Sequence, residues 1–310
     1  MSTASSSPSA ESGAPILVAG GTGLLGVQVA RLLRERGAAV RVLSREPERV
    51  RGRLCAGVTL LAGDVRDAAT LPAAVAGARV VISAVHGFAG SGAESPKTVD
   101  WLGNRNLIEA ARAAGVEQFV LVSVQGASPD HPIELFRMKY RAEQELRRSG
   151  LGWTIIRPTA FMELWVKLIG EPLCTAGATR IFGRGENPIN FVSVYDVARY
   201  VARAACDTSL RGQVLEVGGP ENLSLLQLAE TFARVTGKHG THRHVPLAMM
   251  RAMAVLLRRL KPSLARQIQA GVVMDTRDMR FDAGETFHRF PAIAPTSLAE
   301  MIRRDYGGRA

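Results

Sequence analysis

The sequence predicts an α/β protein: a doubly wound parallel sheet with a smaller, mostly helical C-terminal lobe. Two observations support this prediction. Apolar runs of four to six residues alternate with longer segments of helical period, as βαβ units require. Most of these runs are apolar at every position, which is typical of strands covered by helices on both faces. The chain has 310 residues, of which 46% are hydrophobic, enough to bury a full core.

The alternation places the elements in order along the chain. We expect strands at 16–19, 40–43, 58–61, 79–84, 119–123, 153–156 and 214–217, and helices at 24–36, 99–114 and 135–148. After Gly219 the alternation weakens. There "SLLQLAETFARVTG" is a clear amphipathic helix, and we expect "GKHGTHRHVP" to be a loop. The predicted organisation is a disordered tail at 1–14, a sheet domain at 15–219 and a lobe on the substrate side at 220–310.

The composition excludes several classes of protein. The net charge is +11 (39 basic minus 28 acidic residues), and the segment 241–280 holds eight Arg or Lys against two Asp. This segment resembles no nucleic-acid module, so we expect a solvated basic face and no nucleic-acid partner. Cys55, Cys174 and Cys206 are too far apart to indicate a disulfide framework or a zinc site. With neither a targeting segment nor an apolar run that could span a membrane, a cytoplasmic location is expected.

A glycine-rich turn follows the first predicted strand, in "PILVAGGTGLLG". It fits G-x-G-x-x-G from Gly21, Gly23 and Gly26, and equally G-x-x-G-x-x-G from Gly20, Gly23 and Gly26. Either pattern gives a tight turn without Cβ atoms, followed by a helix whose first amides and positive dipole end bind phosphate. Because a strand precedes the turn and a helix follows it, we favour a dinucleotide-binding turn over a merely structural one.

The end of the second predicted strand indicates which dinucleotide binds. An NAD site would place an acidic residue there for the ribose hydroxyls, whereas this chain has Ser44 and Arg45. A guanidinium holds a 2′-phosphate with two charge-assisted hydrogen bonds. NADP(H) is therefore the expected cofactor, with NAD(H) less favoured. The alternative is a surface Arg45 that pairs with Glu46 or Glu48.

Asp64, in "LLAGDVRD", follows the third predicted strand and has two interpretations. Its carboxylate is suited to accept a hydrogen bond from the adenine amino group while Val65 packs on the ring. It is equally suited to cap a helix that starts near Asp67. The spacing alone does not decide between them.

Four segments together resemble the atypical short-chain dehydrogenase/reductases, specifically their NmrA-like and NAD(P)H-binding group. They are "GGTGLLG", "GDVRD", "VDWLGNRNLIEAARAAGVEQFVLVSVQGA" and "RSGLGWTIIRPTAFME", and the resemblance runs from about Ile16 to Gly219. It implies that 15–219 is a Rossmann-like NAD(P)-binding domain. It says less about the reaction, since the family includes reductases of aromatic and quinone-like substrates, epimerases, assembly factors and redox sensors.

The resemblance also implies roles for individual residues. The pyrophosphate would lie along Gly20, Thr22, Gly23, Leu24 and Gly26, and the 2′-phosphate at Arg45. Ser83 and Ala84 would face the adenine ribose, and Ser123 would lie near the nicotinamide. The backbone of Pro158, Thr159 and Ala160 would meet the carboxamide. A simpler interpretation of the last segment is a strand ended by a proline.

Lys139 is the candidate catalytic residue. Members of the family with ordinary dehydrogenase chemistry have a tyrosine four residues before such a lysine, and here that position is Leu135, which cannot transfer a proton. An isoflavone-reductase-like branch keeps the lysine without the tyrosine, so a reductase remains open. Lys139 would then bind the nicotinamide ribose and hold the ring for hydride delivery. The alternative is an i,i+4 pair with Glu143 on an exposed helix face, and Tyr140 is expected to pack elsewhere.

Three further features are expected to be structural. Asp196 resembles a helix cap in "NFVSVYDVARYVARAA", after a strand at the sheet edge. The cluster of His239, His242 and His244 lacks other ligands, so no metal is predicted. An apolar stripe of Met249, Met250, Met253, Leu256 and Leu257 is expected to pack in the core, with a substrate pocket or a membrane surface as alternatives.

Taken together, the sequence favours an NADP(H)-dependent oxidoreductase. It would transfer a hydride to a carbonyl, quinone or activated alkene of a small, apolar substrate, with Lys139 positioning the cofactor. The absence of the tyrosine motivates an alternative: a redox sensor or assembly factor that binds NADP(H) without turnover and acts through a protein partner. The sequence does not indicate an oligomeric state.

Overall fold

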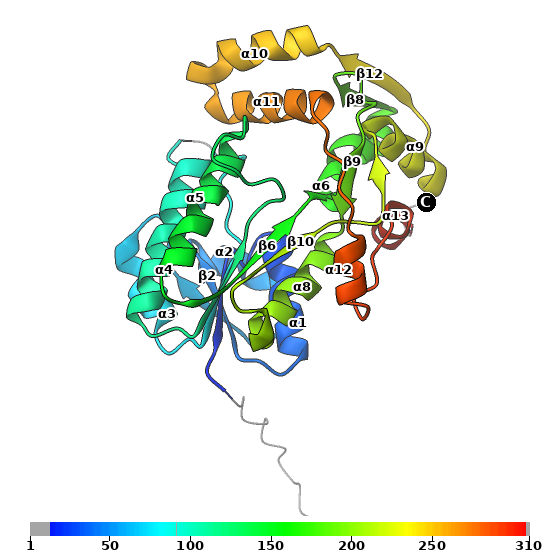
Figure 1. The fold of residues 1–310 in the computed structure, drawn as a ribbon. Helices are drawn as coiled ribbons and strands as arrows, with labels where there is room; N and C mark the ends of the chain where they lie inside the picture. The colour runs from blue at the N-terminus through cyan, green and yellow to red at the C-terminus, as the bar shows by residue number, and fades with distance from the viewer. Residues whose placement is uncertain (1–12, 91, 308–310) are drawn as a thin grey trace, which may run out of the picture.

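The computed structural model describes residues 13–90 and 92–307. Its main element is a sheet of seven parallel strands in the order β10-β6-β5-β4-β1-β2-β3 (Figure 1). The strands are β1 (Ile16–Ala19), β2 (Val40–Ser44), β3 (Val58–Ala62), β4 (Val80–Ser83), β5 (Gln118–Val122), β6 (Gly152–Pro158) and β10 (Gln213–Val217). The strand order reverses between β1 and β4, and in such sheets the ligand crevice lies beyond the carboxyl ends of the strands at this point.

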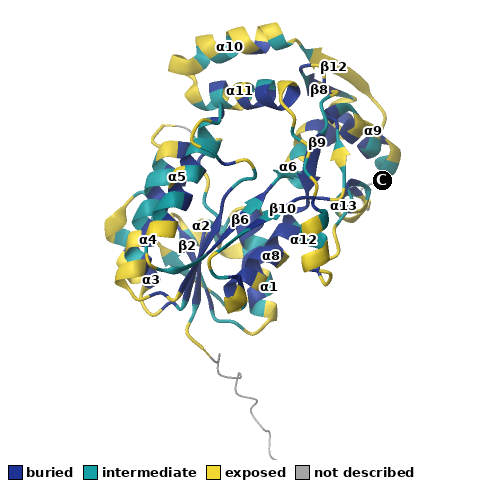
Figure 2. Ribbon diagram, in the orientation of Figure 1, coloured by how far each residue is buried: buried dark blue, intermediate teal, exposed yellow. Residues whose placement is uncertain are grey.

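Helices cover both faces of the sheet and bury it. One face carries α1 (Leu24–Glu35) and α8 (Val194–Cys206), and the other carries α3 (Leu71–Val75), α4 (Asn104–Ala113) and α5 (Glu134–Arg148). The strands in the middle of the molecule are accordingly buried (Figure 2). The predicted fold class, a doubly wound Rossmann-like α/β sheet, is confirmed, and the predicted strands are found within three residues of their expected ends.

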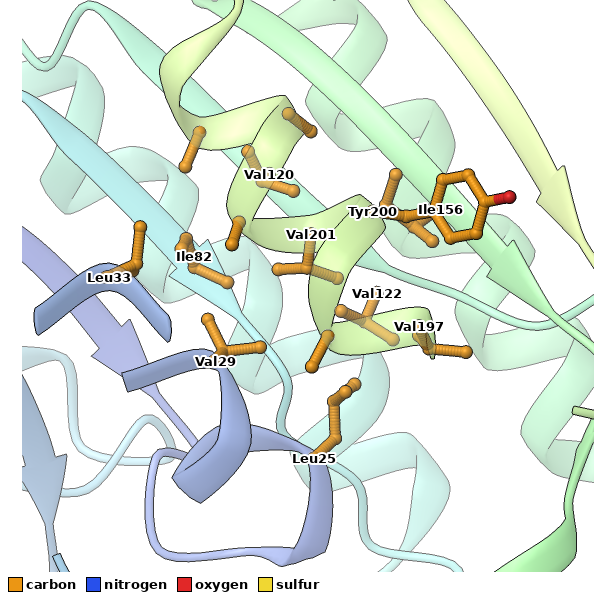
Figure 3. Close-up of a cluster of buried hydrophobic side chains, with 14 of the residues drawn as sticks. Leu25, Val29, Leu33, Ile82, Val120, Val122, Ile156, Val197, Tyr200 and Val201 are labelled. Carbon is orange, nitrogen blue, oxygen red and sulfur yellow. The ribbon is translucent and has the colours of Figure 1, made fainter. Parts of the chain in front are cut away.

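The first face shows why these helices dock where they do. Leu25, Val29 and Leu33 recur every four residues along α1 and face the sheet. They belong to one buried cluster with Ile82 of β4 and Val120 of β5 (Figure 3). All five side chains are at most 6% exposed. Burial of each such side chain contributes about 1.5–3 kcal/mol, so this face holds the turn between β1 and α1 in place.

The helix predicted at 99–114 begins earlier and starts irregularly. It opens with a π-helix, η3 (Pro96–Gly103), before α4 continues the same path. Ser95 caps it: the backbone amide of Thr98 donates to the Ser95 hydroxyl, and the Ser95 amide donates to the Thr98 hydroxyl. Pro96 at the first helical position needs no donor there. The wider winding places Asp100 beneath the carboxyl ends of the strands, where it is completely buried.

The lobe combines two stretches of chain. Its strands are β7 (Ala160–Phe161), β9 (Ile189–Val192) and β11 (Asn222–Leu223) in one small sheet, and β8 (Ala178–Phe182) with β12 (Thr241–Val245) in another. Its helices are α6 (Met162–Trp165), η4 (Val166–Gly170), α7 (Glu171–Ala176), α9 (Leu225–Thr236), α10 (Leu247–Leu260), α11 (Pro262–Thr276), α12 (Gly284–Arg289) and α13 (Leu298–Tyr306). Short helical segments at Pro47–Val50 (α2), Arg51–Arg53 (η1), Ala68–Thr70 (η2) and Thr208–Leu210 (η5) join elements of the main sheet.

Side chains from before and after residue 219 share the core of the lobe. Met162 and Phe191 pack with Phe232 and Met301 in one cluster, while β10 belongs to the main sheet. The predicted division of the chain at 219 stays a prediction, and the predicted tail at 1–14 lies almost entirely outside the described residues. The lobe is therefore built from two stretches of the chain, one that precedes α8 and one that follows β10.

Three local predictions were wrong. The segment expected to be a loop contains β12, an exposed strand parallel to β8. The strand before α8 is β9, which lies in the small sheet with β7 and β11 and not at the edge of the main sheet. The cap of α8 is Ser193, whose hydroxyl accepts from the amide of Tyr195, whereas Asp196 binds the amide and hydroxyl of Thr296 and so attaches the C-terminal segment.

Candidate functional site

A cavity of about 260 Å³ lies at the carboxyl ends of β1, β2, β3 and β4. It is formed by the turn after β1, the residues that follow the neighbouring strands, and the approach to η3. Eight of the predicted binding residues line it: Gly20, Thr22, Gly23, Ser44, Arg45, Asp64, Val65 and Ala84. The residues that line the cavity do not include Leu24, Gly26, Ser83, Ser123, Lys139, Pro158, Thr159 or Ala160. The structure thus brings half of the predicted binding residues together in one cavity, and their contacts with a cofactor remain predictions.

The turn between β1 and α1 has no room for side chains. Gly20 has a φ of +78°, and a Cβ there would lie 2.6 Å from the carbonyl carbon of Ala84. A Cβ on Gly26 would lie 2.2 Å from the carbonyl oxygen of Gly20. Gly23 caps α1 without a side-chain hydrogen bond, so the first helical amides have no acceptor within the helix. A tight turn of this kind at a helix N-terminus fits a pyrophosphate.

Four charged side chains alternate in sign at the other end of the cavity. Arg45 pairs with Glu94, which the chain brings from the approach to η3. Arg66 holds Asp64 with a fork of hydrogen bonds: its Nη2 lies 2.5 Å from Oδ2, and its Nε lies 3.0 Å from each carboxylate oxygen. These bonds lower the pKa of the Asp64 carboxyl, against the opposing effect of burial. Both guanidiniums are therefore neutralised by carboxylates.

Both structural alternatives for this region were wrong. Glu46 and Glu48 pair with Arg49 and Arg51, so neither is the partner of Arg45. The residue that caps the short helix η2 is Asp67, whose carboxylate accepts from the amide of Ala69. The partner of Asp64 is a guanidinium instead. Two arginines at the end of a nucleotide crevice fit a 2′-phosphate, which is the group that guanidinium forks bind best.

Lys139 is buried between the strand ends and not on an exposed helix face. Its Nζ donates to the carbonyl oxygens of Val85 at 2.8 Å and Val122 at 3.0 Å. It also lies 3.0 Å from Oδ1 of Asp100, whose Oδ2 accepts from the amide of Gly87 at 2.8 Å. The alternative pair with Glu143 was therefore wrong. Lys139 ties the ends of β4 and β5 together at the edge where the crevice opens.

His86 lies next to this ion pair and lines the cavity. Its ring is open to the solvent of the cavity, yet protein surrounds it on most sides. This desolvation lowers the pKa of His86 below its ordinary value; the negative charge of Asp100 acts in the opposite direction, and the positive charge of Lys139 adds to the lowering. An imidazole with a lowered pKa next to a buried ion pair is thus a feature of the site that the sequence did not indicate.

The predicted serines hold the sheet to its helices. Ser123 donates to the fully buried carboxylate of Glu143, which Arg157 also holds through its Nε at 2.9 Å and Nη2 at 2.7 Å. Ser83 donates to Oδ1 of Asn104 at 2.6 Å. These hydroxyl protons are therefore used inside the protein. The predicted contacts of Ser83 and Ser123 with the cofactor remain predictions.

The segment after β6 also satisfies its own backbone groups. The carbonyl oxygen of Pro158 accepts from the amide of Gln125 at 2.9 Å, and the amide of Thr159 donates to Val217 at 3.0 Å. Ala160 begins β7, which pairs with β9. Leu24, at the start of α1, is about half exposed. The predicted roles of these four residues toward the cofactor likewise remain predictions.

Leu135, in the position of the missing tyrosine, belongs to an apolar cluster. Leu135, Phe88 and Phe136 pack around the buried Ile133, and Ala270 and Val273 of α11 close the cluster from the lobe. The ring of His131 stacks on Phe136 with a centroid distance of 4.0 Å. The place that holds a proton donor in ordinary family members is thus apolar, and it lies where the lobe meets the sheet domain.

The residues matched by a family model decide what this arrangement is. The model for NAD(P)H-binding proteins matches residues 20–208. The chain belongs to the NAD(P)H-binding family. This NmrA-like family falls among the atypical short-chain dehydrogenase/reductases, and the matched segment spans the glycine turn, both arginines and Lys139. The expected family is confirmed.

Individual relatives of this NAD(P)H-binding protein have different roles. The NAD(P)H azoreductase of Xenophilus azovorans is 32% identical over 229 residues, 72% of this chain and 74% of that protein. The structure of the Escherichia coli NADPH-dependent quinone oxidoreductase with NADPH has a TM-score of 0.75 at 25% identity, covering 93% of this chain and 99% of that one. The photosystem II assembly factor Ycf39 of Synechocystis is 28% identical over 239 residues, 77% of this chain and 72% of that protein.

Other kinds of site find no support in the part of the chain that the structure describes. In residues 13–90 and 92–307, no three His, Cys, Asp or Glu side chains gather as metal ligands. His242 and His244 lie instead on the exposed strand β12. No helix within the same ranges has the length and apolarity needed to cross a bilayer.

Proposed function

We propose that this protein is an NADP(H)-dependent oxidoreductase that transfers a hydride to a carbonyl, quinone or activated alkene of a small, apolar substrate. The observation that carries the proposal is the pair of guanidiniums, Arg45 and Arg66, in the same cavity as the glycine turn of α1. A dinucleotide with phosphate at both ends of its adenosine would meet both the glycine turn and the guanidiniums. This arrangement supports NADP(H) over NAD(H).

The residues at the two ends of the cavity have distinct tasks. The free amides at the start of α1, from Leu24 to Gly26, bind the pyrophosphate. Arg45 and Arg66 bind the 2′-phosphate, which replaces carboxylates as their counter-ion. When bound, the cofactor supplies the hydride. Asp64 and Val65 meet the adenine at the cavity wall.

Lys139 positions the reacting end. Its ammonium group is fixed by Asp100 and by two strand-end carbonyl oxygens, so it holds the carboxyl edges of β4 and β5 in one geometry. A positive charge at this edge is suited to orient the nicotinamide ribose beside it. Because three partners already fix the ammonium group, we assign Lys139 to orientation and not to proton transfer.

The apolar cluster where the lobe meets the sheet domain supports an apolar substrate. Leu135, Phe88 and Phe136 lie where the lobe covers the sheet, and none of them can give up a proton. The proton that accompanies the hydride would therefore come from water. Quinones and other planar acceptors suit this surface, and the azoreductase and quinone oxidoreductase relatives support that class.

A second candidate function rests on the same leucine. With Leu135 in place of the tyrosine, a protein that binds NADP(H) and passes its redox state to a partner is also supported, and a photosystem II assembly factor is among the relatives. Under this alternative both NADPH and NADP⁺ bind and neither is consumed. The two candidates therefore differ in turnover, not in binding.

Calorimetry and an acceptor panel test the proposal in two steps. We expect NADPH to bind at least about tenfold more tightly than NADH, and Arg45→Ala to remove this preference. We then expect quinones or azo dyes to accelerate NADPH oxidation. Equal affinity for the two cofactors would contradict the role of the arginines. Tight binding without turnover by any acceptor would favour the sensor or assembly factor.

A further inference from the structure

Helices α10 and α11 form a hairpin that projects from the lobe over the rest of the molecule (Figure 1). The inner helix α11 is anchored: Ser263, Arg266 and Gln269 donate to carbonyl oxygens of Ala89, Gly90 and Pro132 in the sheet domain. The outer helix α10 packs against α11 and buries one residue, Met250. Its remaining surface is largely exposed (Figure 2).

The exposed surface of the hairpin is unusually apolar. Of eight large hydrophobic side chains exposed in the described chain, five lie in 247–276: Met249, Val255, Leu256, Leu260 and Leu264. Leu256 and Leu260 are 72% and 81% exposed. Together with the half-buried Met253, the spacing of Met249, Leu256 and Leu260 places them along one face of α10. Of the stripe expected to pack in the core, Met250 is buried, Met253 and Leu257 are half-buried, and Met249 and Leu256 are exposed, so the prediction was wrong for those two.

The same surface is positively charged and carries no exposed acid. Arg251, Arg258, Arg259 and Lys261 are all exposed. The single acidic residue of 247–276 is Asp275, which is buried and accepts hydrogen bonds from the amides of Arg184 and Gly185. Apolar side chains flanked by arginines on one exposed helix are the pattern of a helix that lies in a membrane interface.

We propose that the α10–α11 hairpin docks on an anionic phospholipid surface, with α10 lying in the plane of the headgroups. Leu256 and Leu260 would enter the boundary with the acyl chains, and Arg259, which lies beside this face of α10, would extend to the phosphates. The charge selects this occupant over a second copy of the chain. A two-fold dimer through α10 would place the same arginines against each other without any acid to balance them.

This proposal can be tested apart from cofactor binding, because the hairpin contributes no residue to the cavity at β1, although Ala270 and Val273 of α11 belong to the apolar cluster around Ile133. It has one geometric consequence: since α11 is bonded to the segments after β4 and β5, docking would hold the carboxyl edge of the sheet close to the bilayer. Apolar acceptors dissolved in the membrane would then be near the site. Coenzyme binding should be the same with and without vesicles.

Sedimentation with vesicles tests the proposal. We expect the protein to bind vesicles of phosphatidylcholine mixed with phosphatidylglycerol and not vesicles of phosphatidylcholine alone. Leu256→Ser/Leu260→Ser should lower the partition by about tenfold or more, and Arg258→Glu/Arg259→Glu should abolish it. Two matched pairs of changes elsewhere should leave it unaltered: Leu164→Ser/Leu168→Ser, on exposed leucines of α6 and η4, and Arg112→Glu/Arg148→Glu, on exposed arginines of α4 and α5.

Each other outcome overturns the proposal. Circular dichroism melting curves verify that every variant is folded. We expect the hairpin variants to fold because the four changed positions, Leu256, Arg258, Arg259 and Leu260, are exposed. Failure of the wild-type protein to bind the anionic vesicles, or equal loss in hairpin and matched variants, would reject the lipid surface. If sedimentation equilibrium shows dimers that Leu256→Ser/Leu260→Ser converts to monomers, without vesicle binding, the hairpin is an interface between copies of the chain.

Discussion

The carboxylate of Glu94 pairs with the guanidinium of Arg45 across the end of the cavity, although the two residues are 49 positions apart. A carboxylate there occupies the donors that a 2′-phosphate would use. Under the proposed role of Arg45, cofactor binding would exchange one anion for another. Glu94 would then compete with the 2′-phosphate for this guanidinium.

Replacement of Glu94 by glutamine should strengthen NADPH binding. We expect Glu94→Gln to raise the affinity for NADPH by about five- to tenfold, since Arg45 no longer has to leave a charged partner, with little effect on NADH. Isothermal titration calorimetry at low salt measures this. Glu46→Gln, which removes the partner of Arg49, is the matched control. An unchanged or weaker affinity for NADPH in Glu94→Gln would show that Glu94 does not compete.

A side chain at Gly26 should weaken cofactor binding. The Cβ of Gly26→Ala would lie 2.2 Å from the carbonyl oxygen of Gly20, so the turn must open and its amides must move. We expect a loss of at least about tenfold in NADPH affinity and about 1–3 kcal/mol in the free energy of unfolding. Gly52→Ala is the control, because a Cβ there meets nothing within 4 Å. Wild-type affinity in Gly26→Ala would refute the role of the turn.

The Lys139–Asp100 pair should be strongly coupled. Lys139→Met leaves the buried carboxylate of Asp100 without its counter-ion and should lower the free energy of unfolding by about 3–5 kcal/mol. Adding Asp100→Asn should recover part of this loss, since asparagine still accepts from the amide of Gly87. Urea unfolding of the wild type, Lys139→Met, Asp100→Asn and the double variant gives the coupling energy between the two side chains. If the losses in unfolding free energy of the two single variants sum to that of the double variant, Lys139 and Asp100 are not coupled.

His86 should make stability depend on pH on the acid side of neutrality. Its folded-state pKa is lowered by burial, so the unfolded chain binds more protons between that value and the ordinary 6.5. The contribution of His86 to the free energy of unfolding is therefore fully present above about pH 6.5 and is lost as the pH falls through the folded-state pKa. Urea unfolding from about pH 7.5 down to 5 should show this loss, and His86→Gln should reduce it.

Two other histidines serve as comparisons for the pH experiment on His86. His131, whose pKa is also lowered by burial, should leave a residual pH dependence in His86→Gln. His239→Gln, on an exposed loop residue, is the control and should behave as the wild type. A pH dependence in His86→Gln as steep as in the wild type would show that the ring does not titrate as its surroundings require.

The sequence predicted the parts of the molecule that depend on local patterns. Ile16–Ala19 is a strand with the expected ends because four apolar residues run directly into glycines. Arg45 was found because its place after β2 is fixed by the βαβ unit. Both conclusions need only neighbouring residues, and Arg45 lies in the cavity beside the glycine turn.

Contacts between distant segments could not be predicted in this way. Asp100 reaches Lys139 because a π-helix turns it inward, and no pattern in "PKTVDWLG" signals that winding. Arg66 stood in the quoted motif "GDVRD", but its position in the cavity depends on how that segment folds back. β12 was missed because "THRHV" is polar on both sides.

The apolar stripe on α10 illustrates a different limit. A period of 3.6 residues shows that one side of a helix is apolar, but not whether another element covers it. Met250 packs inward, whereas Leu256 and Leu260 do not, because α11 covers only one side of α10. Helical periodicity therefore established the stripe and left its partner undetermined.

The chain crosses from the sheet to the lobe after β6, returns through α8 to β10, and then crosses again. Met162 and Phe191 come from the first crossing, and their partners Phe232 and Met301 from the second. No single cut in the chain separates the lobe intact. Truncation after Val217 would remove Phe232 and Met301 from the core that they share with Met162 and Phe191. New specificities in such a chain must arise by replacing side chains in place, and not by exchanging a terminal module.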